Sequence, residues 1–316
     1  MSLLLTLTAT LSAPLLGGTI VVHPTDNLIE AVASASPGDV LLLADGVYHV
    51  SEYETRQHDN RAAFVIIDKD ITIAAQNVGR AVMDGGAEDM IGGVLAVHAG
   101  TVVLRGLNIT GGFLNGPGGG VQIVGNATRV DIQNCNIFKN TAGRYVAHIS
   151  DAMPGGGVYI DKSTVTFENC SLYDNYASDM GGGAVCIWDG TVDFKNCNFH
   201  GNKALDGGGG GAYIHAGTVT FDKCHFHGNH AEGCSGTYGG GVYLYDGHMV
   251  VQECKINKNT EKHDDYNICE GGGGGIAISN FSSPYAHPTF SIDDKTVVDD
   301  NEPEDCYGFS HPACIH

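Results

Sequence analysis

Histidines recur in a phrase that the chain contains twice. FKNCNFHGNKA covers residues 194–204 and FDKCHFHGNHA covers residues 221–231, so the copies begin 27 positions apart. If the copies lie side by side, His200, His225 and His227 come together, and imidazole nitrogens are favoured ligands of Zn²⁺ and Cu²⁺. The three histidines are therefore metal-site candidates. Copying of a repeat unit explains their alignment equally well.

A second set of candidates lies between residues 141 and 161. Arg144, His148 and Asp151 fall in one long irregular segment, and Asp161 follows it. A polysaccharide lyase requires a base that removes a proton and a cation that neutralises the carboxylate of a uronate. These four residues are the catalytic candidates, and calcium is the cofactor that such an enzyme would use. The alternative is that the charged residues of this loop are solvated surface.

Aromatic residues recur just after the glycine runs. Positions two and four beyond the last glycine of a run share one face of the strand that follows. Exposed rings along a groove suit the apolar faces of sugar rings, which predicts a binding surface. Packing of these rings beneath the segment 141–154 is the alternative. The ligand-binding candidates are Tyr159, Trp188, Tyr213, His215, Tyr243 and Tyr245.

The repeat predicts the elements that must position these residues. Aligned on a cysteine, five units place an asparagine five residues later, and apolar and polar residues alternate with a period of two. That period indicates strands, and a single unit has no core of its own, so the units must stack as a solenoid. The aligned cysteines are Cys135, Cys170, Cys197, Cys224 and Cys254, and the asparagines are Asn140, Asn175, Asn202, Asn229 and Asn259.

The opening and the repeats both carry a family resemblance. Residues 26–50, DNLIEAVASASPGDVLLLADGVYHV, resemble the N-terminal cap and first coil of right-handed parallel β-helix proteins of the pectate-lyase-like superfamily. GGAV at 182–185 and FHGN at 199–202 and 226–229 resemble the repeats of polymorphic outer-membrane proteins. The resemblance implies an all-β, right-handed parallel β-helix of about eight or nine coils with a short N-terminal capping helix. It also implies that the strand after each glycine run is the one that carries the active site in the enzymes of the superfamily.

The superfamily contains enzymes, adhesins and surface proteins, so the fold alone does not decide the activity. This sequence lacks the Gly-His-Gly block of polygalacturonase-like hydrolases and the Asp-Pro-His-Glu block of alginate epimerases.

Three segments are expected along the chain. Residues 1–17 are uncharged and mostly apolar, and are either a signal peptide or an apolar cap. Residues 18–290 form the β-helix, and residues 291–316 form an acidic C-terminal cap or tail. No later stretch approaches the ~20 apolar residues that a membrane span needs, so no span is predicted.

The cysteines divide into core positions and disulfide candidates. The five aligned thiols are expected to point inward as small apolar side chains, and Cys186 is expected to share the inward position of Ile160 and Ile214. Cys234 and Cys269 lie in corresponding loops and are one candidate disulfide; Cys306 and Cys314 are another. Disulfides would indicate an oxidising compartment.

Charge narrows the range of partners. The chain has 36 Asp+Glu against 16 Lys+Arg, a formal net charge of −20, so phosphate backbones would repel it and nucleic acid is not expected as a partner. We expect a secreted or cell-surface protein with a non-catalytic binding, adhesive or structural role. Its partner would be a polysaccharide or cell-surface glycan, or other protein subunits. The alternative is a polysaccharide lyase or a related glycan-active enzyme.

Overall fold

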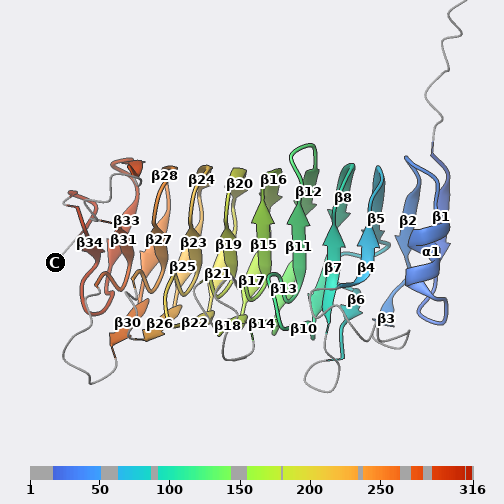
Figure 1. Cartoon of the computed structure of the whole chain (residues 1–316), viewed down its shortest axis with the longest axis horizontal. Helices are drawn as coiled ribbons and strands as arrows, with labels where there is room; N and C mark the ends of the chain where they lie inside the picture. Colours follow the sequence, from blue (N-terminus) through green and yellow to red (C-terminus); the bar gives the residue numbers. More distant parts are fainter. Residues whose placement is uncertain are drawn as a thin grey trace, which may run out of the picture.

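The structure, a computed structural model, describes residues 17–50, 63–86, 92–143, 155–178, 181–233, 238–263, 272–279, 287–309 and 311–314. Within these ranges the chain winds into a rod of stacked coils, with the first strands at one end and the last strands at the other (Figure 1). Strands of successive coils pair in parallel and in register.

Four sheets run along the described part of the rod, and we name them C, A, B and D in the order in which a repeat coil passes through them. Sheet C contains β4 (Ala63–Ile67), β7 (Gly93–Val97), β11 (Val121–Val124), β15 (Val158–Asp161), β19 (Val185–Ile187), β23 (Ala212–Ile214), β27 (Val242–Leu244), β31 (Ile276–Ile278) and β34 (Cys306–Tyr307). Sheet A contains β1 (Thr19–Val22), β2 (Val40–Leu43), β5 (Ile71–Ala75), β8 (Thr101–Arg105), β12 (Arg129–Gln133), β16 (Ser163–Glu168), β20 (Gly190–Lys195), β24 (Thr218–Asp222), β28 (His248–Gln252) and β32 (Thr289–Ile292).

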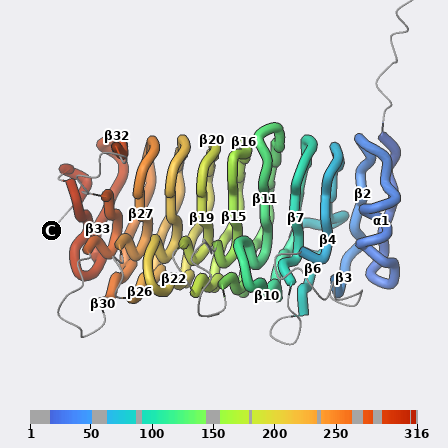
Figure 2. The backbone as a smooth tube through the Cα atoms, viewed as in Figure 1, coloured from blue at the N-terminus to red at the C-terminus, as the bar shows by residue number. Residues whose placement is uncertain are grey.

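Sheet B completes the coils, and sheet D adds a further strand to the coils from β10 to β30 (Figure 2). Sheet B contains β3 (Gly46–His49), β6 (Ala81–Asp84), β9 (Leu107–Thr110), β13 (Asn136–Phe138), β17 (Ser171–Tyr173), β21 (Asn198–His200), β25 (His225–His227), β29 (Lys255–Asn257) and β33 (Val297–Asp299). Sheet D contains β10 (Phe113–Leu114), β14 (Thr141–Ala142), β18 (Tyr176–Ala177), β22 (Lys203–Leu205), β26 (His230–Gly233) and β30 (Thr260–His263). The predicted all-β parallel solenoid is confirmed.

The turn from sheet A to sheet B uses one residue in the left-handed region. Asn134, Asn169 and Asn196 have φ angles of 53°, 54° and 51°. Asparagine is one of the few non-glycine residues that visit this region readily, because its short polar side chain can bond locally. Asparagine is therefore suited to this turn.

Inward side chains of successive coils lie directly on one another. Phe194 stacks between Phe167 and Phe221, with ring centroids 4.6 Å and 5.0 Å apart, and Phe199 stacks on Phe226 at 4.2 Å. The five aligned cysteines are at most 2% exposed, and burial raises the pKa of the Cys135 thiol to about 11. These thiols serve as core side chains, as the alternation of the strands predicted.

The asparagines five residues after the cysteines form a buried ladder. Asn202 illustrates it: its side-chain amide donates to the Leu172 carbonyl at 2.9 Å and to Asn229 Oδ1 at 2.8 Å. Its own Oδ1 accepts the backbone N–H and side-chain amide of Asn175 at 3.1 Å and 3.0 Å. A buried amide is costly unless its donors and acceptors are all used, and here each coil supplies partners to the next.

The glycine runs allow two backbones to approach closely. A Cβ atom added at Gly210 would lie 2.6 Å from the backbone of His230, and one at Gly240 would lie 2.3 Å from the Thr260 carbonyl. Real Cβ atoms do not come this near to backbone, so the chain before sheet C packs on sheet D only because these side chains are missing.

A short helix covers the N-terminal end of the rod. Helix α1 (Leu28–Ser34) starts at Asn27, whose side chain accepts the backbone N–H groups of Ile29 and Glu30, and it buries Leu28 and Val32. Lys69 donates to the carbonyls of Val32, Ala33 and Ala35 at the C-terminal end of the helix. The predicted capping helix is present.

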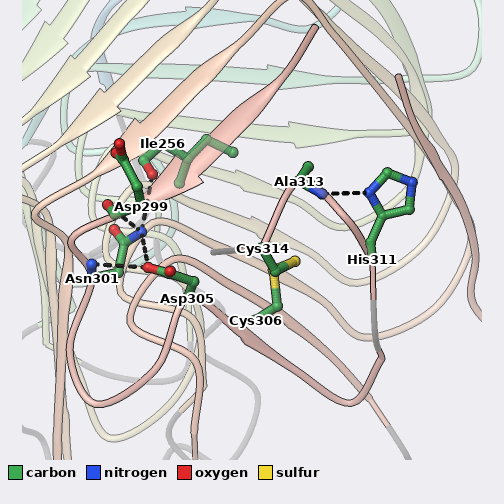
Figure 3. Close-up of a disulfide and its surroundings, with 8 residues drawn as sticks. All are labelled: Ile256, Asp299, Asn301, Asp305, Cys306, His311, Ala313 and Cys314. Atoms are coloured by element: carbon green, nitrogen blue, oxygen red, sulfur yellow. Dashed lines mark hydrogen bonds between the residues drawn. A yellow bond between two sulfur atoms is a disulfide. The ribbon is translucent and has the colours of Figure 1, made fainter. Parts of the chain in front are cut away.

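The C-terminal coil closes the other end. Cys306 and Cys314 form a disulfide, and the amide of Asn301 donates to Asp305 Oδ1 at 2.9 Å, which ends the asparagine ladder (Figure 3). Strands β32, β33 and β34 extend sheets A, B and C. Residues 291–307 therefore add a further turn of the solenoid, in the segment where a cap or tail was expected. The second disulfide candidate, Cys234 with Cys269, lies outside the described residues, as does most of the segment 1–17.

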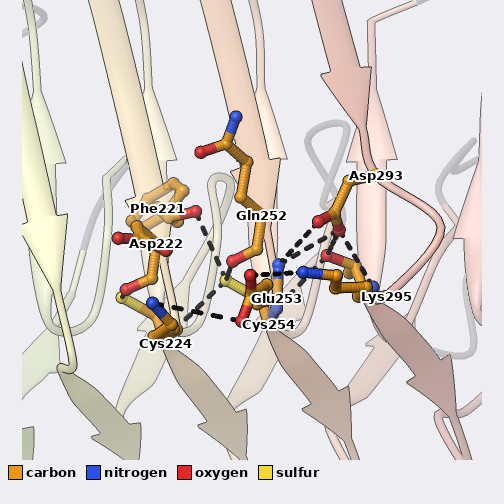
Figure 4. A network of polar contacts seen from close by, with 10 residues as sticks. Phe221, Asp222, Cys224, Gln252, Glu253, Cys254, Asp293 and Lys295 are labelled. Carbon is orange, nitrogen blue, oxygen red and sulfur yellow. Dashed lines mark hydrogen bonds and ion pairs between the residues drawn. The ribbon is translucent and has the colours of Figure 1, made fainter.

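Charged side chains tie the last two coils together on the surface. The backbone N–H of Glu253 donates to Asp293, and Lys295 Nζ lies 2.7 Å from Glu253 Oε1 (Figure 4). These groups are largely exposed, so their contribution to stability is small. In the described part of the chain, no helix is long and apolar enough to cross a membrane.

Asn202→Ala should destabilise the solenoid strongly. The substitution removes four hydrogen bonds at a site with no exposure, and it leaves the backbone N–H and one side-chain N–H of Asn175 without partners. We expect a loss of roughly 2–5 kcal/mol in the free energy of unfolding, measured by denaturant titration. Asn126→Ala, at an exposed position, is the control and should change stability by less than about 0.5 kcal/mol. Equal effects of the two substitutions would contradict the ladder's role.

Glu261→Gln should remove a pH dependence of stability. Burial raises the pKa of Glu261 from 4.5 to about 7. The folded state thus holds this proton more tightly than the unfolded state, so stability falls as pH rises from about 4.5 to 7 and then stays level. At pH 8 the variant should be more stable by on the order of 2–3 kcal/mol, and at pH 4 the difference should vanish. Exposed Glu304→Gln is the control; a pH-independent difference for Glu261→Gln would contradict the expectation.

Candidate functional site

Two rows of side chains lie on the outer side of sheet C. The first, which we call the covered row, follows the in-register partners of Tyr159 along the rod. Tyr213 and Tyr243 in this row are only 4% exposed, and Tyr238 packs on Tyr243 with ring centroids 5.0 Å apart. Burial raises the pKa of both Tyr213 and Tyr243. The covered row consists of Tyr159, Cys186, Tyr213, Tyr243, Ala277 and Tyr307.

The prediction that Tyr213 and Tyr243 present open rings to a ligand is therefore wrong for the described structure. Both belong to a small second apolar cluster on the outside of sheet C. Packing, the alternative considered for these rings, describes them better. Tyr159 and Tyr245 border the same cluster and are partly exposed.

Cys186 also lies in the covered row, and its predicted inward position beside Ile160 and Ile214 is wrong. Cys186 pairs with Tyr159 and Tyr213, whereas Ile187 takes the inward position. The error comes from the glycine run, because Ala184 occupies the place that Gly157 and Gly211 hold in the neighbouring coils. Counting from the last glycine shifts the register by one residue, and one residue turns every side chain to the other face.

The second row, which we call the rim row, stands where sheet C turns into sheet A. It consists of Asp161, Trp188, His215 and Tyr245, each directly after an inward residue of its coil. The backbone N–H groups of Trp188, His215 and Tyr245 donate to carbonyls of the preceding coil at 2.8 Å, which fixes their positions. All four side chains are partly exposed.

The rings of the rim row stack face to face. Trp188 and His215 have centroids 3.4 Å apart at an angle of 12°, and His215 and Tyr245 are 5.2 Å apart at 11°. Neighbouring rings thus cover one another's faces. The ring edges carry the polar groups, which are the indole N–H of Trp188, the imidazole nitrogens of His215 and the phenol O–H of Tyr245. A ligand beside this row would meet hydrogen-bonding edges rather than the apolar ring faces that the sequence suggested.

An open groove lies beside the rim row, at the turn between sheets C and A. Its volume is about 580 Å³. Hydroxyl, carboxylate and ammonium groups dominate its wall, and Lys162 and Asp189 directly follow Asp161 and Trp188 of the rim row. The lining residues are Asn126, Lys162, Ser163, Thr164, Asp189, Gly190, Thr191, Gly217 and Thr218.

Burial shifts the titration of two rim residues in opposite directions. It raises the pKa of Asp161, an effect that Lys162 reduces and Asp189 increases. It lowers the pKa of His215, which favours the neutral imidazole. Asp161 Oδ1 and His215 Nδ1 are buried atoms without a hydrogen-bond partner among the described residues.

Of the four catalytic candidates, only Asp161 can be placed. Arg144, His148 and Asp151 lie outside the described residues. Across the described ranges no group of three His, Cys, Asp or Glu side chains could hold a metal ion, and calcium as a cofactor stays a prediction.

The metal-site candidates His200, His225 and His227 do not form a group that could hold a metal ion within the described residues. His200 and His227 stack with centroids 5.1 Å apart at 10°, continuing a ladder that starts with Phe138 and Tyr173. His225 Nε2 lies 3.0 Å from Asn257 Oδ1. His225 and His227 lie with ring centroids 4.4 Å apart, tilted by 34°.

The rim row as a unit was missed from the sequence. Its residues are of four different types, so no repeated letter marks it. The available signal was the turn that follows, since Asp189-Gly190, Ala216-Gly217 and Asp246-Gly247 come directly after Trp188, His215 and Tyr245.

Comparison with known proteins supports the fold. The family model described as the right-handed beta helix region matches residues 119–309. A comparison with curated protein sequences found no match.

Several solved structures are similar to this chain. A mutant of the PL6 family alginate lyase AlyGC is 16% identical with a TM-score of 0.44, and the match covers 90% of this chain and 39% of that chain. The A-module of the Azotobacter vinelandii mannuronan C-5 epimerase AlgE4 is 14% identical with a TM-score of 0.36, and the match covers 90% and 92%. This chain thus spans about two fifths of the length of the alginate lyase.

The resemblance of the repeats to polymorphic outer-membrane proteins stays a prediction. The other resemblance, to β-helix proteins, is confirmed by the family match and by the parallel coils of the structure. Since the matched region covers more than half of the sequence, the chain belongs to the right-handed β-helix family.

Proposed function

We propose that the protein binds a neutral, hydroxyl-rich glycan chain along the rim row. One observation carries the proposal: Asp161, Trp188, His215 and Tyr245 form a continuous line of polar edges beside an open groove of about 580 Å³. Successive edges are one coil apart, about 4.8 Å. That interval is close to the length of one sugar residue in an extended glycan, so consecutive sugar residues can each meet one polar edge of the row.

The rim row is rigid before any ligand arrives. Its backbone is held by the parallel ladder, and each ring is held by its neighbour in the stack. Ordering of side chains is a main cost of binding, and a preformed row reduces that cost. The groove wall adds the hydroxyls of Thr164, Thr191 and Thr218, which can both donate and accept.

Charge favours a neutral ligand over an anionic one. The chain carries a formal net charge of −20, Asp189 lines the groove, and Asp161 directly precedes the groove residue Lys162. Lys162 is the single cationic residue of the groove wall as described. A polyuronate would meet repulsion from this surface, whereas a neutral glycan would not.

The proposed setting is outside the cell or on its surface. The Cys306–Cys314 disulfide supports this, because such bonds persist in oxidising compartments. The role would be non-catalytic, as a binding, adhesive or structural protein whose partner is a polysaccharide or cell-surface glycan.

A polysaccharide lyase is the second candidate, favoured by the opposite pKa shifts of Asp161 and His215. Two groups whose pKa values are shifted in opposite directions can act as the acid and the base of one reaction. Their spacing argues against it. Asp161 and His215 are two coils apart, roughly 10 Å, and Trp188 stands between them. Elimination needs the acid and the base at adjacent atoms of one sugar residue.

Binding can be followed with the chain's single tryptophan. Trp188 lies in the rim row, so neutral oligosaccharides that bind there should change its fluorescence in a saturable way. Tyr245→Phe removes one hydroxyl from the row and should weaken binding roughly tenfold, the effect of one lost hydrogen bond. Tyr173→Phe, on the outer face of sheet B, is the matched control and should bind normally. Equal affinities of the two variants, or no response to any neutral glycan, would reject the proposal.

The lyase candidate is tested by incubating the full chain with polyuronates, with and without calcium. We expect no unsaturated uronate product, measured by its ultraviolet absorbance. If product forms and His215→Gln abolishes it, the rim row is catalytic. In that case burial, which lowers the pKa of His215, should keep the base neutral and the rate undiminished somewhat below pH 6.5.

A further inference from the structure

A hydroxyl, an imidazole and a carboxylate are joined in series on the outer face of sheet D. Thr260 Oγ1 lies 2.6 Å from His230 Nδ1, and His230 Nε2 lies 3.3 Å from Glu232 Oε2. Thr260 and His230 are in-register partners on β30 and β26, and Glu232 is two residues after His230 on the same face. The three groups are partly exposed, so small molecules can reach them.

Lys203 sets the proton arrangement of this series. Its Nζ lies 2.7 Å from Glu232 Oε2, and this hydrogen bond lowers the pKa of the Glu232 carboxyl. An ionised carboxylate only accepts hydrogen bonds, so His230 Nε2 must be the donor to it. In the neutral imidazole the other nitrogen, Nδ1, then carries the lone pair, and Thr260 Oγ1 must donate to it. A hydroxyl that donates to a histidine held by a carboxylate is the arrangement of an activated nucleophile.

We propose that Thr260 is an acyl-accepting nucleophile, with His230 as its base and Glu232 as the group that positions His230, and that its substrates are small carboxylic esters. The site lies on sheet D, away from the rim row on sheet C, and does not depend on the glycan-binding proposal. Lys262 pairs in register with Glu232 on β30, so it adds a positive charge to the same stretch of sheet D.

The reaction balances without a cofactor. Thr260 Oγ1 bonds to the ester carbonyl carbon while its proton passes to His230 Nδ1. The bond to the leaving oxygen then breaks, and that oxygen takes the proton from His230. The product is an acyl ester of Thr260. Water hydrolyses this ester in the same way, with His230 accepting a proton from water and returning it to Thr260 Oγ1, so a carboxylic acid is released.

The full chain is tested with p-nitrophenyl acetate. Wild type should release nitrophenol, and mass spectrometry after an acid quench should find an acetyl group on Thr260. Thr260→Val keeps the shape of the side chain and should lower the rate about tenfold or more, as should His230→Gln. Thr260→Ser keeps a hydroxyl and should retain the activity.

Thr141→Val is the matched control, because Thr141 occupies the same row of sheet D four coils earlier, opposite Tyr176 rather than a histidine. It should react like wild type, and unfolding curves should show that the variants remain folded. A Thr260→Val variant as fast as wild type, or an acetyl group found on His230 or a lysine instead of Thr260, would overturn the proposal.

Discussion

In-register parallel pairing of successive coils is the constraint on which the molecule depends. Each residue lies beside the residue at the same place one coil away, about 4.8 Å from it. Phe194 therefore needs rings above and below that can stack, and Phe167 and Phe221 supply them. A residue type that suits its own strand but not its neighbours would disturb three coils at once. The repeated phrase in the sequence meets this requirement, because it places the same residue types at the same positions of successive coils.

The buried asparagine ladder applies the same constraint to polar groups. Each side-chain amide is satisfied only if the next coil presents another acceptor at the same height. The ladder must begin and end on a different group, and the Gly112 N–H and the Asp305 carboxylate fill these places. The ladder also fixes the corner between sheets B and D. The outer face of sheet D, with His230 and Thr260, is thereby held in register.

The sequence was sufficient to predict the scaffold, because the alternation of apolar and polar residues and the repeated unit can both be recognised in short stretches of the chain. The strands, the five inward cysteines and the capping helix could all be predicted. The outer surface was not. One alanine in place of a glycine, at Ala184, shifted the expected register and misplaced Cys186. The cover over Tyr213 depends on packing between coils and cannot be read from one strand. The link between Thr260 and His230 joins residues 30 positions apart, and only the final register brings them together.

Function in this solenoid is best sought where a row stops repeating. In a row of identical side chains, such as the stacked phenylalanines or the asparagines, the members pack on or bond one another. Such a row leaves few groups for a ligand. The rim row changes type at every coil, from carboxyl to indole to imidazole to phenol, and leaves Asp161 Oδ1 and His215 Nδ1 without partners among the described residues. The row on sheet D changes from Tyr176 to Lys203 to His230 to Thr260. Stability does not require such variety, since a uniform row would serve the ladder as well. The two irregular rows are therefore the places where selection for chemistry, rather than for folding, has the most room to act.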